Sequence, residues 1–88
     1  MKIKPGFILR EVAGQAVVVA VSPAAATFNG MVYLNPTSAM LWRQLEQGAT
    51  MDELVEAVLD RYTVDRPSAT LDVDTFLVTM FQAGFVEP

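Results

Sequence analysis

The stretch Gly30-Met31-Val32-Tyr33-Leu34-Asn35-Pro36 decides the fold, because it marks the point at which strands give way to helices. Its apolar centre, Met31 to Leu34, predicts a short strand that follows a turn at Asn29-Gly30. The strand must end at Asn35, since a residue before proline is pushed out of the helical region. Asn35 can then cap a helix whose first position is Pro36, where the missing N–H costs nothing.

Upstream of this junction the sequence predicts a β-hairpin. The segments Phe7–Val12 and Gln15–Val21 are rich in β-branched residues, and the turn between them, Ala13-Gly14, contains glycine. Ser22-Pro23 ends the second strand. The alanine-rich segment Ser22 to Phe28 indicates no particular element, so the strand limits there stay open.

Downstream of the junction we expect three helices. The first runs from Asn35 to about Gln47 and stops at Gly48. The second starts with a capping box, Thr50-Met51-Asp52-Glu53, in which the hydroxyl and the Glu carboxylate satisfy reciprocal backbone donors. The third has its first turn at Pro67 and extends to about Ala83, before Gly84. Strands followed by helices, in the order β-β-β-α-α-α, indicate an α+β fold with helices on one face of an antiparallel sheet.

Length and composition limit the function classes. The 88 residues suffice for one domain, residues 1–88, with a thin core. Apolar residues make up 52% of the chain and charged residues 18%, which excludes intrinsic disorder. Cysteine and histidine are absent, which removes disulfides, thiolate nucleophiles, imidazole bases and nearly every zinc, copper or haem site. We therefore expect no catalytic residues, no metal and no cofactor.

Charge and hydropathy narrow the choice of partners. The net charge of -4 opposes nucleic-acid binding, which needs a basic face. The longest apolar run, Ala16 to Val21, is far shorter than the roughly 20 residues of a membrane span. The first 26 residues imitate a signal peptide, but Arg10, Glu11 and Gly14 interrupt the apolar stretch. We expect a cytoplasmic protein, which the lack of cysteine fits.

The third helix carries more apolar surface than a core requires. At about 100° per residue, its apolar arc is roughly 220° wide, whereas a core-facing stripe needs little more than about 100°. The core side holds Val73, Phe76, Leu77 and Met80, and the surplus flank holds Leu71, Val78 and Phe81. Either the helix is embedded between the sheet and the other helices, or the surplus flank lines a groove for an apolar partner.

The short strand Met31–Leu34 is expected at an edge of the sheet, because four residues bounded by Asn-Gly and Asn-Pro can hardly form its middle. An edge strand leaves backbone N–H and C=O groups unpaired. It is therefore either covered by another part of the chain or available to an added strand.

The polar side chains have ordinary explanations. Asp52, Glu56 and Asp60 share one helix face, which is typical of a solvated surface rather than of an acid–base pair or a Mg²⁺ site. Asp74 lies in the early turns of the third helix, where the macrodipole favours acids and where it can also receive a basic partner residue. Trp42 is expected to anchor the core.

Taken in order and spacing, several motifs resemble the PqqD-like family. They are Gly30-Met31-Val32-Tyr33-Leu34-Asn35, Leu41-Trp42, Gly48-Ala49-Thr50 before Glu53-Leu54, Tyr62-Thr63-Val64-Asp65, Asp72-Val73 before Phe76-Leu77, and Gly84-Phe85. The resemblance covers nearly the whole chain. It includes the coenzyme PQQ synthesis chaperone and the recognition elements of ribosomally made, post-translationally modified peptides. It implies a winged helix-turn-helix-like fold of a three-stranded sheet and three helices.

The resemblance also implies a function. Such proteins bind the leader segment of a precursor peptide and present the peptide to a modifying enzyme, commonly a radical-SAM protein or a leader protease. The leader adds as a strand beside the third strand and lies in the cleft between that strand and the third helix. Carried over to this sequence, the peptide-binding residues are Met31, Val32, Tyr33, Leu34, Asp74, Val78 and Phe81, and Leu71 joins them from the surplus flank.

Two other classes of function compete with this hypothesis. The same fold supports a winged-helix nucleic-acid-binding protein, which the acidic balance opposes. A dimerisation or adaptor module can pair the edge strands of two copies into a homodimer.

Overall fold

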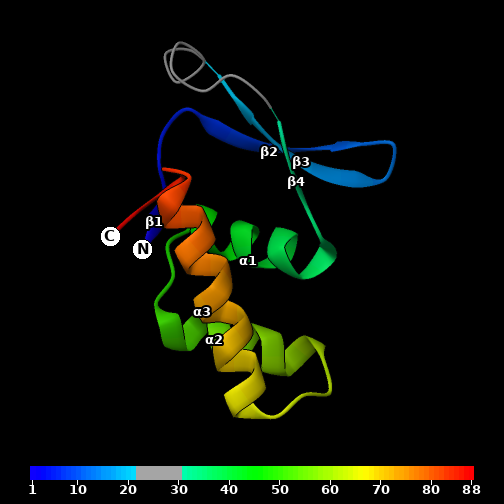
Figure 1. Ribbon diagram of the computed structural model, residues 1–88, viewed down its shortest axis with the longest axis vertical. Helices are drawn as coiled ribbons and strands as arrows, with labels where there is room; N and C mark the ends of the chain where they lie inside the picture. The colour runs from blue at the N-terminus through cyan, green and yellow to red at the C-terminus, as the bar shows by residue number, and fades with distance from the viewer. Residues whose placement is uncertain (22–30) are drawn as a thin grey trace.

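The computed structural model describes residues 1–21 and 31–88 and has an α+β fold (Figure 1). The elements of the described residues are β1 (Lys2–Ile3), β2 (Phe7–Val12), β3 (Gln15–Ala20), β4 (Val32–Leu34), α1 (Pro36–Glu46), α2 (Met51–Arg61), α3 (Arg66–Gln82) and β5 (Val86–Glu87). An antiparallel sheet has the order β2-β3-β4, and the three helices follow it in the chain. Figure 1 shows the sheet at one end of the molecule, next to α1, with α2 towards the other end and α3 running from there back past α1. The predicted fold class is confirmed.

The hairpin of β2 and β3 forms as the sequence predicts. Val12 pairs with Gln15 across the two-residue turn Ala13-Gly14. Both turn residues have a positive φ, 52° at Ala13 and 79° at Gly14, which is what a type I′ turn requires. Because this turn matches the twist of the flanking strands, it sets the register of the whole hairpin.

The first two helices begin at the predicted caps. Asn35 Oδ1 accepts a hydrogen bond from the Ser38 N–H at 2.8 Å. Thr50 Oγ1 accepts from the Glu53 N–H at 3.1 Å, and Glu53 Oε1 accepts from the Thr50 N–H at 2.9 Å. Both bonds of the capping box are therefore present.

The cap of α3 was not identified from the sequence. The helix begins at Arg66, one residue before the predicted start at Pro67, and Asp65 is its N-cap. Asp65 Oδ1 accepts from the Ser68 N–H at 2.8 Å, and the hydrogen bonds from Ser68 hold the pKa of the Asp65 carboxyl below its usual value. The Arg66 guanidinium forms an ion pair with Glu56 of α2, which raises the pKa of Arg66.

The core is built around Trp42, which is fully buried as predicted. The ring of Phe85 packs edge-to-face on Trp42 at 5.7 Å between centroids, and on Phe7 at 4.9 Å. The other fully buried large side chains are Val17, Val18, Leu41, Leu45, Leu54, Val58 and Val73. The C-terminal segment after α3 therefore belongs to the core, which fits the expectation that Phe85 folds back after Gly84.

α3 buries one stripe and exposes the rest. The stripe consists of the four predicted core residues together with Ala69. On the surplus flank Leu71 is 66% exposed, Val78 53% and Phe81 40%. The interpretation in which α3 is embedded on two sides is therefore wrong, because solvent reaches one face along most of the helix.

A second sheet joins the two ends of the chain and was missed by the sequence analysis. β1 and β5 are antiparallel, with Lys2 opposite Glu87 and Ile3 opposite Val86. The Lys4 N–H continues the pairing by donating to the Phe85 carbonyl at 2.8 Å. Strands of two residues have no hydrophobic period, and their pairing depends on the tertiary fold, so no local pattern indicates them. The observed order is therefore β-β-β-β-α-α-α-β rather than β-β-β-α-α-α.

Some expectations concern residues outside those described. The turn at Asn29-Gly30, the end of the hairpin at Ser22-Pro23 and the segment Ser22 to Phe28 all fall there. The predicted strand Met31–Leu34 is described and is one residue shorter, from Val32. Among the described helices, none is both long and apolar enough to cross a bilayer.

Candidate functional site

The strand β4 lies at the edge of the three-stranded sheet, as expected. It pairs with β3 on one side, and no described strand pairs with its other side. Its residues Val32, Tyr33 and Leu34 lie opposite Val18, Val17 and Ala16 of β3. The edge is the place where an incoming strand can find main-chain partners.

The hairpin turn determines which backbone groups of β4 face this edge. In a two-residue hairpin, Val12 and Gln15 exchange both hydrogen bonds, and such pairs then alternate along the ladder. The hydrogen bond from the Val21 N–H to the Gly6 carbonyl, at 2.7 Å, continues the same alternation. The odd-numbered residues of β3 therefore bond to β2, and the even-numbered residues bond to β4.

This alternation makes Tyr33 the residue whose main chain faces outward. Ala16 and Val18 bond to the residues opposite them on β4, which are Leu34 and Val32. The pair of Val17 and Tyr33 is then not hydrogen-bonded, so the Tyr33 N–H and C=O point away from β3, towards the outer edge of the sheet.

A groove of about 540 Å³ lies between β4, the start of α1 and one side of α3. Its lining residues are Val32, Tyr33, Leu34, Asn35, Thr37, Ser38, Leu41, Leu71, Asp72, Thr75, Phe76, Thr79 and Met80. Leu34, Leu41, Phe76 and Met80 are buried core residues, so the floor of the groove is apolar. The remaining lining residues include the polar Asn35, Ser38, Asp72 and three threonines. Apolar pockets with a few polar groups at the rim are typical of ligand sites.

The start of α1 holds one wall of the groove in place. The Thr37 hydroxyl donates to the Tyr62 hydroxyl at 3.0 Å, which ties the first turn of α1 to the end of α2. Asn35 belongs both to the end of the edge strand and to the cap of α1. The groove is therefore assembled from three segments: the Asn35 cap joins β4 to α1, and buried residues of α1 and α3 belong to one core.

The eight residues predicted to bind peptide do not all lie together. Four of them line the groove, namely Val32, Tyr33, Leu34 and Leu71. Met31 directly precedes β4 and is exposed, but it is not a lining residue. Asp74, Val78 and Phe81 do not line the groove either. At about 100° per residue they lie on α3 roughly 60–120° from Thr75, which does.

The polar half of the α3 residues that line the groove was missed. Asp72, Thr75 and Thr79 line the groove, but they are polar and therefore do not belong to the apolar surface from which the site was predicted. The pattern that could have identified Thr75 and Thr79 is their spacing of four residues from Leu71 and from each other. Residues at this spacing lie next to one another along one side of a helix. The Thr79 hydroxyl donates to the Thr75 carbonyl at 3.0 Å, which turns its polar atom back onto the helix.

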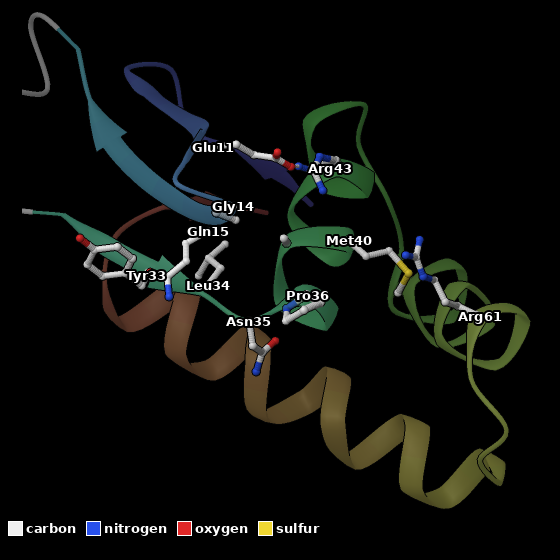
Figure 2. A pocket seen from close by; sticks show the side chains of 12 residues that line it. Glu11, Gly14, Gln15, Tyr33, Leu34, Asn35, Pro36, Met40, Arg43 and Arg61 are labelled. Carbon is white, nitrogen blue, oxygen red and sulfur yellow. Dashed lines mark hydrogen bonds and ion pairs between the residues drawn. The ribbon is translucent and has the colours of Figure 1, made fainter.

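A second cleft, of about 510 Å³, lies between the tip of the hairpin and α1 (Figure 2). Figure 2 shows the side chains of Glu11 and Arg43 pointing towards one another, and their ion pair measures 3.3 Å. Arg61 of α2 lies farther along the same cleft, beyond Met40. Both members of the ion pair are well exposed, so it contributes little stability.

The described residues offer no cluster of side chains for a metal ion. Within residues 1–21 and 31–88, no three carboxylates lie close enough together to hold a metal ion. Asp52, Glu56 and Asp60 are exposed on α2, as expected for a solvated face. The carboxyl with a lowered pKa, Asp65, is occupied as a helix cap. What the site offers is main-chain hydrogen bonding beside an apolar groove.

The sequence matches the model of the family described as coenzyme PQQ synthesis protein D (PqqD), over residues 16–86. The chain belongs to the PqqD family. The match includes all but the first residue of β3, together with β4, the three helices and the first residue of β5, and therefore every segment that lines the groove. No functionally curated protein matches the sequence.

Two solved structures share the fold of this PqqD-family chain. One is TbiB1 in complex with the TbiA(beta) leader peptide, with a TM-score of 0.80 and 24% identity, covering 99% of this chain and 95% of that one. The other is lasso peptide synthetase B1 complexed with the leader peptide, with a TM-score of 0.79 and 17% identity, covering 99% and 96%. At these identities the likeness establishes the fold.

Proposed function

We propose that this protein is a non-catalytic module that captures the leader segment of a ribosomally made precursor peptide by strand addition to β4. The observation that carries the proposal is the outward-facing main chain of Tyr33 beside an apolar groove. Membership of the PqqD family supports it, as do two proteins of the same fold that were solved with leader peptides.

The mechanism is physical rather than chemical. Hydrogen bonds to the edge of β4 give affinity for any extended peptide, while apolar side chains in the groove select among peptides. A modifying enzyme bound to the same module, of the radical-SAM or leader-protease type, then meets the core peptide at a high effective concentration. No cofactor enters this scheme, and it places the protein in the cytoplasm, where the precursor is made.

The proposed peptide-binding residues are those that line the groove. Val32, Tyr33 and Leu34 supply the edge, and Leu71 and Thr75 supply the opposite wall. Asp74, Val78 and Phe81 fall outside this surface. A nucleic-acid-binding role is not favoured, since α3 has a single basic residue, Arg66, and that residue is paired with Glu56.

The test uses two variants of α3 that add the same side chain on different faces. Thr75→Arg places a long cation in the groove, whereas Val78→Arg places it on exposed surface outside the groove. Leader segments from short precursor genes beside this gene are titrated by calorimetry into the wild type and both variants. Binding to the wild type and to V78R, with at least about a tenfold loss in T75R, supports the proposal. Failure of every neighbouring leader to bind the wild type would contradict it.

Homodimerisation is the competing use of the same edge. Two copies pairing through β4 would hide the Tyr33 main chain from any peptide. Light scattering at the concentrations used for calorimetry separates the two cases, because leader capture requires that the edge be vacant when the peptide arrives.

A further inference from the structure

The hydrogen-bonding alternation of the sheet restricts how a peptide can dock, and this inference rests on the proposed function. The peptide-facing N–H and C=O on β4 belong to Tyr33, whereas those of Val32 and Leu34 are used by β3. Because both strand pairs of the sheet are antiparallel, the peptide is expected to add as an antiparallel fourth strand. One peptide residue then lies opposite Tyr33 and exchanges both hydrogen bonds with it.

The same register decides which peptide side chains enter the groove. Directly opposed residues in a sheet place their side chains on the same face. Val32 and Leu34 face the core, where they pack with the hydrophobic cluster, while Tyr33 faces the other side and is 59% exposed. The peptide residue opposite Tyr33 therefore projects away from the groove, and the residues on either side of it project into the groove.

The chemistry of the groove selects what those two residues are. Its floor contains Leu41, Phe76 and Met80, all buried apolar side chains. Among the described lining residues Asp72 alone is charged, so none of them is a cation that could receive an acidic side chain. A volume of about 540 Å³ lies within the range of small-ligand sites, roughly 300–1,000 Å³, and accommodates more than one side chain.

The geometry points to a recognition sequence of the form apolar–any–apolar, whose middle residue pairs with Tyr33 and whose two large apolar side chains fill the groove. The middle side chain lies over the Tyr33 ring on the outer face of the sheet, and its identity is weakly restricted. The spacing of two residues distinguishes this mode from a helix in the groove, whose anchors are three or four residues apart.

The first test selects peptides without assuming a natural ligand. A phage library of random twelve-residue peptides is selected on the full chain, and binders that T75R retains are discarded. Enriched sequences are expected to carry two large apolar residues two positions apart. Enrichment of adjacent apolar residues, or of pairs three or four apart, would overturn the register but leave peptide binding intact. If no groove-dependent peptide is enriched, both the register and the proposed function are contradicted.

The second test probes the main chain of an enriched peptide. Replacing one amide at a time by an ester removes single N–H donors, and the largest loss is expected at the middle residue, about fivefold for one hydrogen bond. On the protein side, Tyr33→Pro removes the N–H that donates to the peptide, and Tyr33→Ala removes only the side chain. Y33P is expected to lose several times more affinity than Y33A. A largest ester effect at one of the two apolar residues would overturn the register, whether or not Y33P folds.

Discussion

Tyr33 lies directly opposite Val17 on the neighbouring strand, yet the two side chains differ greatly in exposure, at 59% and 1%. Because the pair is not hydrogen-bonded, the N–H and C=O of Tyr33 point away from β3, towards the open edge of the sheet. Tyr33 also lines the groove beside that edge. Tyr33 thus lies on the edge strand β4 and lines the groove beside α3, and the turn at Ala13-Gly14 determines the direction in which its main chain points.

The alternation can be tested in the free protein with two proline variants. Val32→Pro removes an N–H that bonds to β3, whereas Tyr33→Pro removes one that points outward. We expect V32P to lower the free energy of unfolding by about 1–2 kcal/mol more than Y33P does, as measured by urea denaturation. Equal losses in the two variants would show that the assigned alternation is wrong.

The capping box of α2 should contribute measurably to stability. Thr50→Ala removes the acceptor of the Glu53 N–H and is expected to cost about 1 kcal/mol. Thr70→Ala serves as the matched control, because Thr70 is an exposed residue within α3. Urea denaturation should show a lower free energy of unfolding for T50A and little change for T70A. An equal decrease in T70A would contradict a stabilising role of the cap.

The Asp65 cap predicts a dependence of stability on pH. The pKa of Asp65 is lowered in the folded protein by the hydrogen bonds from Ser68, so folding favours the ionised form. This contribution is present above the usual pKa of 3.8 and is lost as the pH falls through the lower folded value. Asp65→Asn keeps a capping oxygen without a titrating group.

The measurement for Asp65 is the unfolding free energy of wild type and D65N from pH 7 down to pH 2. The difference between the two proteins should be constant near neutrality and should shift against the wild type below about pH 4. A difference that does not change with pH would contradict the role of the ionised cap.

Two phenylalanines four residues apart should differ sharply in their importance for stability. Phe85 is buried against Trp42 and Phe7, whereas Phe81 is 40% exposed. We expect Phe85→Ala to cost about 3–5 kcal/mol, a large part of the stability of so small a domain. Phe81→Ala should cost less than about 1 kcal/mol. Thermal unfolding followed by circular dichroism compares them, and a similar loss in both would contradict the packing described for Phe85.

Much of the fold could be predicted from local chemistry. The glycine-containing turn, Asn35-Pro36 and the capping box are short-range signals, and the strand and helix limits that depend on them were correct to within one or two residues. The pairing of β1 with β5 could not be predicted. It joins residues at opposite ends of the sequence, and each strand has only two residues, too few for a hydrophobic period.

The lining of the groove could be predicted from the sequence only on its strand side. Strand length and flanking turns place Val32–Leu34 at an edge without knowledge of the tertiary structure. The helix side depends on how α3 is rotated against the sheet, which no local pattern specifies. The apolar criterion therefore selected Val78 and Phe81, whereas the residues that face β4 include Thr75 and Thr79.

Amide hydrogen exchange at Tyr33 tests strand addition to β4 most directly. In the free protein the Tyr33 amide should exchange faster than the amides of Val32 and Leu34, whose hydrogen bonds go to β3. Adding a saturating leader peptide should slow exchange at Tyr33 by at least about tenfold, while Val78 on the exposed side of α3 stays unchanged. A saturated complex in which the Tyr33 amide exchanges as fast as in the free protein would contradict the account.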